Sequence, residues 1–64
     1  MKIYIEKTDK LIGLKGIRDG KELLEKLDIN PQTVILTKND EVILEDEELS
    51  ESDEIKILSV ISGG

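Results

Sequence analysis

The chain has 64 residues, which suffices for one small domain and excludes a two-domain enzyme. It contains no Cys and no His, which excludes disulfides, thiol nucleophiles, Cys-based metal sites and histidine general bases. Its formal net charge of −6 argues against nucleic acid and anionic membranes as direct partners and favours a basic patch on a partner protein.

Two sequence features indicate a soluble, cytoplasmic protein. The first residues carry no charged-then-apolar leader, and no stretch reaches the roughly 18 apolar residues of a membrane span. Hydrophobic residues make up 38% of the chain and are almost all Ile, Leu or Val. In so small a domain, nearly every one of them is needed for a single core.

The N-terminal segment predicts a β-hairpin. In residues 2–7 apolar and polar side chains alternate, which places Ile3 and Ile5 on one buried face of a strand. A Thr-Asp turn follows, and residues 10–16 form the second strand. Gly13 within this strand predicts a bulge.

A helix is predicted to begin after Asp19. Asp19 can cap the first turn, and Glu22 three residues later completes a capping-box pattern. Pro31 is expected to end the segment after two to three turns, because the residue before a proline avoids the helical conformation. The apolar stripe of this helix consists of Leu23, Leu24 and Leu27.

The next part of the chain predicts a second hairpin. Residues 33–38 and 42–44 read as strands, and Asn39-Asp40 is the turn between them. The aliphatic run at 34–36 is continuous, so we expect the first of these strands to be covered on both faces.

An acidic connection leads to the last strand. Residues 45–54 are mostly Asp and Glu, with Leu49 as their apolar anchor. Residues 54–60 form the final strand, with Ile55 and Ile57 directed inward.

This order of elements predicts an α+β fold, with a mixed sheet of four to five strands and one helix packed on one face. We expect one domain over residues 1–64, with a flexible C-terminal tail at 61–64. The sheet face that covers the helix stripe is predicted to comprise Ile3, Ile5, Val34, Leu36, Ile55 and Ile57.

Nothing inside the chain predicts a catalytic or metal site. The acidic connection lacks the glycine and the ligand spacing of a calcium loop. Gly13, Gly16 and Gly20 do not have the spacing of a phosphate-binding loop, and Gly16 or Gly20 is expected to form a turn. Ser and Thr hydroxyls have no histidine base to activate them.

The chain ends in Gly63-Gly64 directly after the last predicted strand. Simple fraying is one explanation of two terminal glycines. The other is functional: without side chains, such a tail can thread a narrow channel and present its carboxylate inside another protein. A carboxylate is a poor electrophile, so its use requires activation, for instance as a mixed anhydride with AMP.

With this ending, the order of elements resembles the ubiquitin-like sulfur carriers, ThiS and MoaD, and ThiS more closely because MoaD proteins are usually longer. The resemblance implies the β-grasp fold. Two turns depart from the family pattern, with Asn39-Asp40 where Asn-Gly is frequent and Ser52-Asp53 where Gly-Asp is common. The resemblance covers the whole chain and is carried by residues 21–27, 34–39, 41–43 and 53–55 and by the Gly-Gly end.

The resemblance implies a carrier and not an enzyme. A ubiquitin-activating-type enzyme, similar to ThiF or MoeB, would use ATP and Mg²⁺ to adenylate the carboxylate of Gly64. A sulfur donor such as a cysteine desulfurase would convert it to a thiocarboxylate, and an acceptor such as thiazole synthase would take the sulfur for thiamine. Ile61, Ser62 and Gly63 would enter the partner's active site, and the carrier itself would hold no cofactor or metal.

The resemblance also implies a docking surface for the activating enzyme, with Ile43, Leu58 and Val60 as candidates. Ordinary core packing is the competing explanation for each of these residues. Other sulfur acceptors stay open: molybdopterin synthesis as for MoaD, tRNA thiolation, or conjugation to proteins as a modifier. A non-covalent ubiquitin-like interaction module is the alternative in which the Gly-Gly end has no role.

Overall fold

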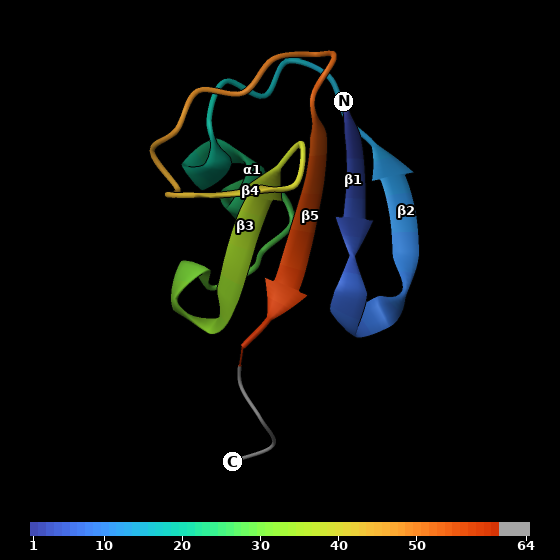
Figure 1. Cartoon of the computed structure of the whole chain (residues 1–64), viewed down its shortest axis with the longest axis vertical. Coiled ribbons are helices and arrows are strands. Elements are labelled where there is room, and N and C mark those ends of the chain that lie inside the picture. Colours follow the sequence, from blue (N-terminus) through green and yellow to red (C-terminus); the bar gives the residue numbers. More distant parts are fainter. Residues whose placement is uncertain (61–64) are drawn as a thin grey trace.

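The computed structural model describes residues 1–60, which form a mixed sheet of five strands with an α-helix on one face (Figure 1). Two short 3₁₀ helices, η1 and η2, lie in the connections. The elements are β1 (Lys2–Ile5), η1 (Glu6–Thr8), β2 (Lys10–Gly13), α1 (Gly20–Lys26), η2 (Pro31–Thr33), β3 (Val34–Lys38), β4 (Glu41–Ile43) and β5 (Glu54–Ser59). No helix in this part of the chain is long and apolar enough to cross a membrane.

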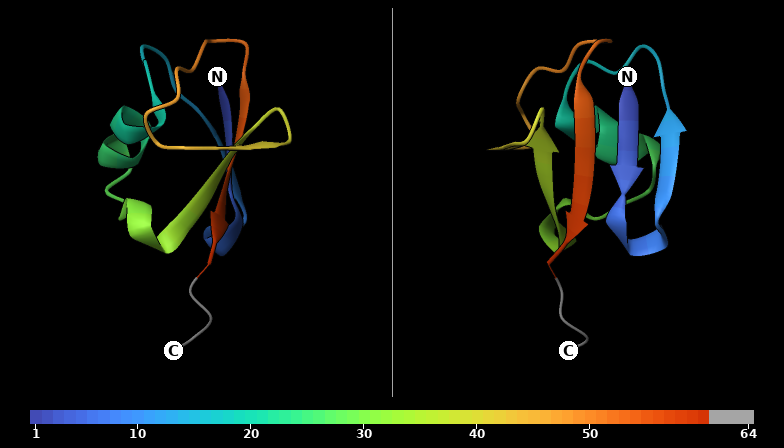
Figure 2. Two further views of the ribbon diagram at one scale, coloured as in Figure 1. Left: turned by 60° about the vertical axis from the view of Figure 1, so that its left-hand side comes forward. Right: turned by 45° about the vertical axis from the view of Figure 1, so that its right-hand side comes forward.

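The strands lie in the order β2-β1-β5-β3-β4, so the last strand occupies the centre of the sheet. β1 and β5 are parallel, with Ile3 opposite Ile55 and Ile5 opposite Ile57, while the other neighbours are antiparallel. Helix α1 lies across one face of the sheet (Figure 2). This is the predicted α+β arrangement of a β-grasp domain.

The predicted core face is confirmed. Ile3, Leu36, Ile55 and Ile57 are buried, and Ile5 and Val34 are half-buried against them. Leu23 and Leu24 of α1 are buried in the same cluster, and half-buried Leu27 packs against it. Leu49 anchors the acidic connection as expected, and Ile17, which no pattern had assigned, also joins the core.

The helix begins as predicted, but the capping box is displaced by one residue. The Asp19 side chain accepts a hydrogen bond of 2.8 Å from the Glu22 amide. The Glu22 carboxylate accepts from the amide of Arg18, 3.0 Å away, where a capping box would use the amide of Asp19.

The helix does not end at Pro31. It ends at Lys26, and Asp28 then adopts a left-handed conformation with φ 57°. The amides of Asp28 and Ile29 return to the carbonyls of Glu25 and Leu24, at 3.1 and 2.9 Å, which is the Schellman pattern. These bonds satisfy carbonyls of the last turn.

The first hairpin is shorter than predicted. The strand expected at 2–7 ends at Ile5, because residues 6–8 turn into η1. The strand expected at 10–16 ends at Gly13, which pairs with Lys2 in regular register and therefore forms no bulge. Gly16 has φ 75°, which confirms a turn at that position.

The second hairpin closes at the predicted turn. Asn39 and Asp40 both have positive φ, 51° and 72°, which is the type I′ geometry of a two-residue hairpin loop. β3 begins one residue later than predicted, and β4 begins and ends one residue earlier than predicted. The last strand, β5, ends one residue earlier than predicted. β3 is not covered on both faces, because Ile35 is 40% exposed on the face away from α1.

Candidate functional site

The predicted site residues of the tail, Ile61, Ser62, Gly63 and Gly64, lie outside the described residues. The structure does show the segment from which they continue. The amide of Val60 donates to the carbonyl of Thr33 at 3.2 Å, and the amide of Ser59 donates to the Glu6 carboxylate at 3.2 Å. The end of the central strand is therefore held from both sides by η1 and η2.

Two of the three predicted docking residues lie on the accessible surface near this end. Leu58 is half-buried on the outer face of the sheet, the face away from α1, where it lies opposite Ile35 in the register of β3 and β5. Val60 is 44% exposed. Ile43 is half-buried on the helix side and packs against the core. On β4 the exposed side chain is that of Val42, because neighbours along a strand face opposite ways.

A groove of about 670 Å³ opens on the helix side, next to the end of β5. Its lining combines aliphatic residues, among them Ile5, Leu27 and Ile57, with polar ones, and its charged residues are Lys7 and Asp28. A lysine and an aspartate without a buried carboxylate pair or a nucleophile do not make a hydrolytic or acid–base centre. The groove therefore adds no catalytic machinery to the described part of the chain.

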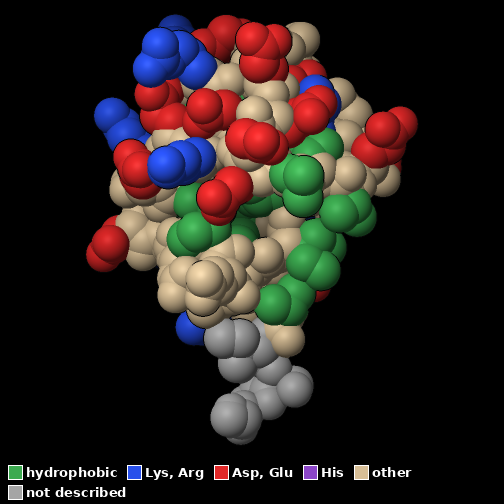
Figure 3. All heavy atoms as spheres, turned by 90° about the vertical axis from the view of Figure 1, so that its left-hand side faces the viewer, with side chains coloured by type: hydrophobic (Ala, Val, Ile, Leu, Met, Phe, Trp, Pro, Cys, Tyr) green, Lys and Arg blue, Asp and Glu red, His purple; other side chains and the backbone are tan. Residues whose placement is uncertain are grey.

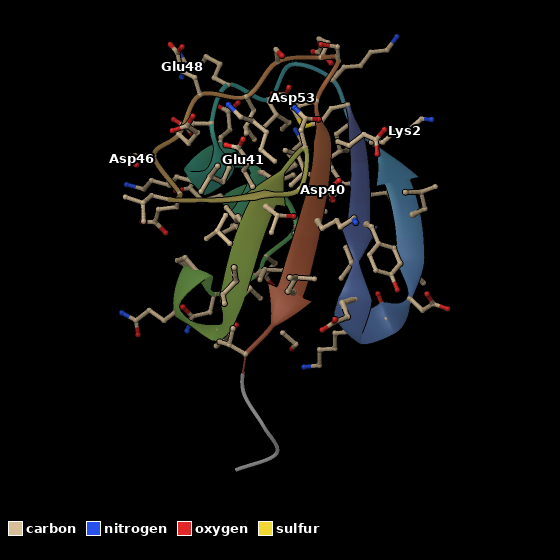
Figure 4. All side chains as sticks on the ribbon, in the orientation of Figure 1. Lys2, Asp40, Glu41, Asp46, Glu48 and Asp53 are labelled. Carbon is tan, nitrogen blue, oxygen red and sulfur yellow. The ribbon has the colours of Figure 1, made fainter. Side chains whose placement is uncertain are left out.

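The carboxylates of the acidic connection bond to separate partners and do not gather around a centre. Glu51 accepts from the amide of Gly16 at 2.8 Å, which lowers the pKa of the Glu51 carboxyl. Lys38 donates to the Glu47 carboxylate at 3.1 Å, and this bond raises the pKa of the lysine. Figure 4 shows Asp46, Glu48 and other labelled acids spread along the surface at this end of the molecule. Within residues 1–60 no group of acidic side chains is arranged to hold a metal ion.

The two turns that depart from the family pattern contact each other. The Asn39 side chain donates to Asp53 at 3.1 Å and accepts from the amide of Glu54 at 3.0 Å. Asp53 also accepts from the amide of Ser50 at 2.8 Å. The bond from Ser50, together with the one from Asn39, lowers the pKa of the Asp53 carboxyl. Asn39 and Asp53 are 14 residues apart, so no local sequence signal predicted this link.

Acid should weaken the fold through Asp53. A carboxyl whose pKa is lowered by folding contributes stability above its unfolded pKa, about 3.9, and loses that contribution as the pH falls through the folded value. We expect Asp53→Asn to reduce the free energy of unfolding at neutral pH and to make its decline below pH ~4 shallower. Urea unfolding from neutral to strongly acidic pH measures both effects, and Asp46→Asn, at an exposed residue of the same connection, is the control. An equally steep decline in Asp53→Asn and wild type would assign the acid sensitivity to other carboxyls.

The ThiS family model matches residues 3–64, which include the Gly-Gly end. A sulfur carrier protein from Thermus thermophilus, TtuB, is 40% identical over 55 residues, which cover 86% of this chain and 85% of TtuB. An uncharacterized protein from Archaeoglobus fulgidus is 44% identical over 43 residues, or 67% of this chain and 63% of that protein. The similarity therefore extends over the sheet, the helix and the residues that follow β5.

Proposed function

Because the chain belongs to the ThiS family and is a sulfur carrier protein, we propose that the carboxylate of Gly64 is the group that carries the sulfur. Sulfur carriers of this family are substrates of an adenylating enzyme and are not enzymes themselves. The observation that carries the proposal is the family match, which continues through Gly63-Gly64. In this proposal the partner recognises the folded domain, and residues 61–64 are the tail that enters its active site.

The proposed chemistry starts with activation of the carboxylate. A ThiF- or MoeB-like enzyme with ATP and Mg²⁺ joins the Gly64 carboxylate to AMP and releases pyrophosphate. The persulfide of a donor such as a cysteine desulfurase then displaces AMP to give an acyl disulfide, and a thiol reductant cleaves its S–S bond and leaves the thiocarboxylate on Gly64. Transfer to the acceptor regenerates the carboxylate, so the carrier is recycled. We propose the cytoplasm, where ATP is available, as the site of this reaction.

The absence of cysteine agrees with this chemistry. With no thiol in the chain, a side-chain persulfide cannot be the carried form. Without side chains, Gly63 and Gly64 fit a channel too narrow for other residues. Ser62 is small, and the hydrogen bonds at Ser59 and Val60 fix the point from which the tail enters the partner.

We propose that the activating enzyme docks on the outer face of the sheet, near the end of β5. Leu58 and Ile35 lie opposite each other there, and Val60 is exposed at the end of β5. Aliphatic side chains next to the reacting end let a partner bury apolar surface while it receives the tail. Ile43 would contribute through its packing under β4, while exposed Val42 is the residue of that strand available for direct contact.

Intact-mass analysis tests the proposal. After incubation with the activating enzyme, ATP, Mg²⁺ and a sulfur donor, the protein is expected to gain the mass of one oxygen-to-sulfur exchange. Deletion of Gly64 is expected to abolish the gain, and Gly13→Ala, which leaves the C-terminus unchanged, to retain it. No exchange with a partner that binds the protein would favour a non-covalent interaction module.

For the acceptor we propose thiazole formation in thiamine biosynthesis, with thiazole synthase as the receiving enzyme. The support is the match to the ThiS family model. Cells that lack the gene are expected to need added thiazole, and the wild-type gene, but not the version without Gly64, to remove this need. Growth without thiazole, combined with a loss of tRNA thiolation, of molybdopterin or of protein conjugates, would assign the sulfur to that other acceptor.

A further inference from the structure

The edge of the sheet at β3 is only partly covered. β4 pairs with β3 from Lys38 to Leu36 and then leaves the sheet after Ile43. The first two residues of β3, Val34 and Ile35, pair with β5 on one side. On the other side no strand of residues 1–60 pairs with them, and Figure 1 shows this end of β3 beyond the reach of β4.

The backbone of Val34 faces this open side. The carbonyl of Thr33 and the amide of Asn39, which flank β3, both form hydrogen bonds toward β5. Because hydrogen-bonding direction alternates along a strand, Val34, like Leu36, directs its N–H and C=O toward the β4 side. Leu36 meets Ile43 there, whereas Val34 has no strand opposite it in the part of the chain that the structure describes.

A groove of about 500 Å³ lies against this open edge, and we call it the β3-edge groove. Its lining includes Pro31 of η2 and the β4 and post-β4 residues Val42 and Leu44, with buried Leu24 of α1 at its base. Val42 and Leu44 are 73% and 75% exposed, which is high for aliphatic side chains. Figure 3 shows this side of the molecule, with hydrophobic side chains flanking a hollow and acidic side chains above it.

The charges at the groove have one sign. Glu45 and Asp46 line it, and no Lys or Arg does so among residues 1–60. Glu41, at the start of β4, is also acidic but does not line the groove. A segment with Lys or Arg is attracted to this rim, whereas a second copy of the chain, with net charge −6, would bring further negative charge.

We propose that the β3-edge groove binds an extended segment of a partner protein, in which apolar side chains alternate and are flanked by Lys or Arg. The segment continues the sheet where β4 leaves it and pairs its backbone with Val34. Its alternate side chains contact Leu24 and Pro31 on one face and Val42 on the other. This binding takes no part in the chemistry of Gly64, and its surface shares Val42 with the proposed docking face of the activating enzyme.

Selection of peptides from a phage-displayed library of random dodecapeptides on the intact protein tests the proposal. The expected consensus has alternating aliphatic residues with Lys or Arg at its ends. Leu44→Lys, which places a cation on the rim, is expected to weaken binding of the selected peptide by about tenfold or more. Leu11→Lys is the matched control, since Leu11 is 69% exposed on β2 at the far edge, and it should leave the affinity unchanged.

Hydrogen exchange separates strand addition from simple adhesion. Binding of the selected peptide is expected to slow exchange of the Val34 amide, and methylation of the peptide's backbone nitrogens should weaken its binding. Three results would each overturn the proposal. The selected peptides could lack the consensus of alternating aliphatic residues flanked by Lys or Arg, Leu44→Lys could bind the selected peptide as tightly as wild type, or the Val34 amide could exchange at the same rate with and without the peptide. A free protein that dimerises through this edge, with the dimer lost in Leu44→Lys, would make a second copy the occupant and also overturn it.

Discussion

Replacement of Gly20 by Ala is expected to destabilise the protein by about 1–3 kcal/mol. Gly20 is buried at the first position of α1, where the acidic connection crosses the helix. A Cβ atom there would lie 2.7 Å from Cδ1 of Leu36, 2.9 Å from the carbonyl oxygen of Glu45 and 3.1 Å from the Glu45 Cα. Two of these neighbours are backbone atoms, so the crossing itself would have to move.

The same movement would break hydrogen bonds. The amide of Lys21 donates to the Glu45 carbonyl at 2.6 Å, and the amide of Gly20 donates to Glu47 at 3.3 Å. Alanine favours the helix by up to about 1 kcal/mol over glycine, which offsets only part of the loss. For a domain of this size, with a total stability of roughly 3–10 kcal/mol, the remainder is a large fraction.

Urea unfolding of Gly20→Ala and Gly13→Ala measures the effect. Both variants remove one glycine from the unfolded chain, so their unfolded states change alike. A Cβ atom at Gly13 would have its nearest neighbour, the Met1 carbonyl oxygen, at 3.8 Å, which is ordinary contact. We therefore expect Gly13→Ala to stay within about 0.5 kcal/mol of wild type. Equal free energies of unfolding for the two variants would show that the backbone at Glu45 can shift to accommodate a methyl group at Gly20 without loss of stability.

Gly63→Val is expected to slow activation by the adenylating enzyme roughly 10- to 100-fold, because forcing a branched side chain into a channel shaped for glycine costs on the order of 1–3 kcal/mol. The free energy of unfolding should not change, since the buried core of residues 1–60 extends from Ile3 to Ile57. The rate of ATP–pyrophosphate exchange at saturating ATP measures activation, and urea unfolding measures the fold.

Ser52→Val is the matched control for this variant. Ser52 is exposed in the acidic connection, so the same side chain is added away from the tail. We expect Ser52→Val to be activated at the wild-type rate. Wild-type activation of Gly63→Val would contradict a narrow channel, and loss of cooperative unfolding in Gly63→Val would make the glycine structural.

Much of the fold follows from local patterns. Alternation placed Ile3, Ile55 and Ile57 on the core face, because the two-residue period of a strand is a property of the backbone. Asp19 marked the start of the helix, since its side chain reaches an amide only three residues away. The Gly-Gly end was the specific sign of the family, and the match to residues 3–64 confirmed it.

The ends of the elements could not be predicted in the same way. Pro31 seemed to end the helix, but the chain turned earlier, at Asp28, a residue type without a strong signal for the left-handed conformation. The aliphatic run of β3 indicated a strand covered on both faces, but the helix covers one face and leaves Ile35 on the other. The aliphatic run at β4 is continuous as well, so the sequence pattern could not show that Ile43 packs against the core and that Val42 is exposed.

Sequence alone determined the class of fold, most residues of the core and the family of sulfur carriers, because strand alternation, helix caps and the Gly-Gly ending can be recognised from neighbouring residues. The tertiary structure decided the close approach of Gly20 to Glu45, the link from Asn39 to Asp53 and the open edge at Val34. Each of these depends on where segments distant in the chain meet. Contacts between such segments depend on how the whole core packs, so they cannot be predicted from a short stretch of sequence.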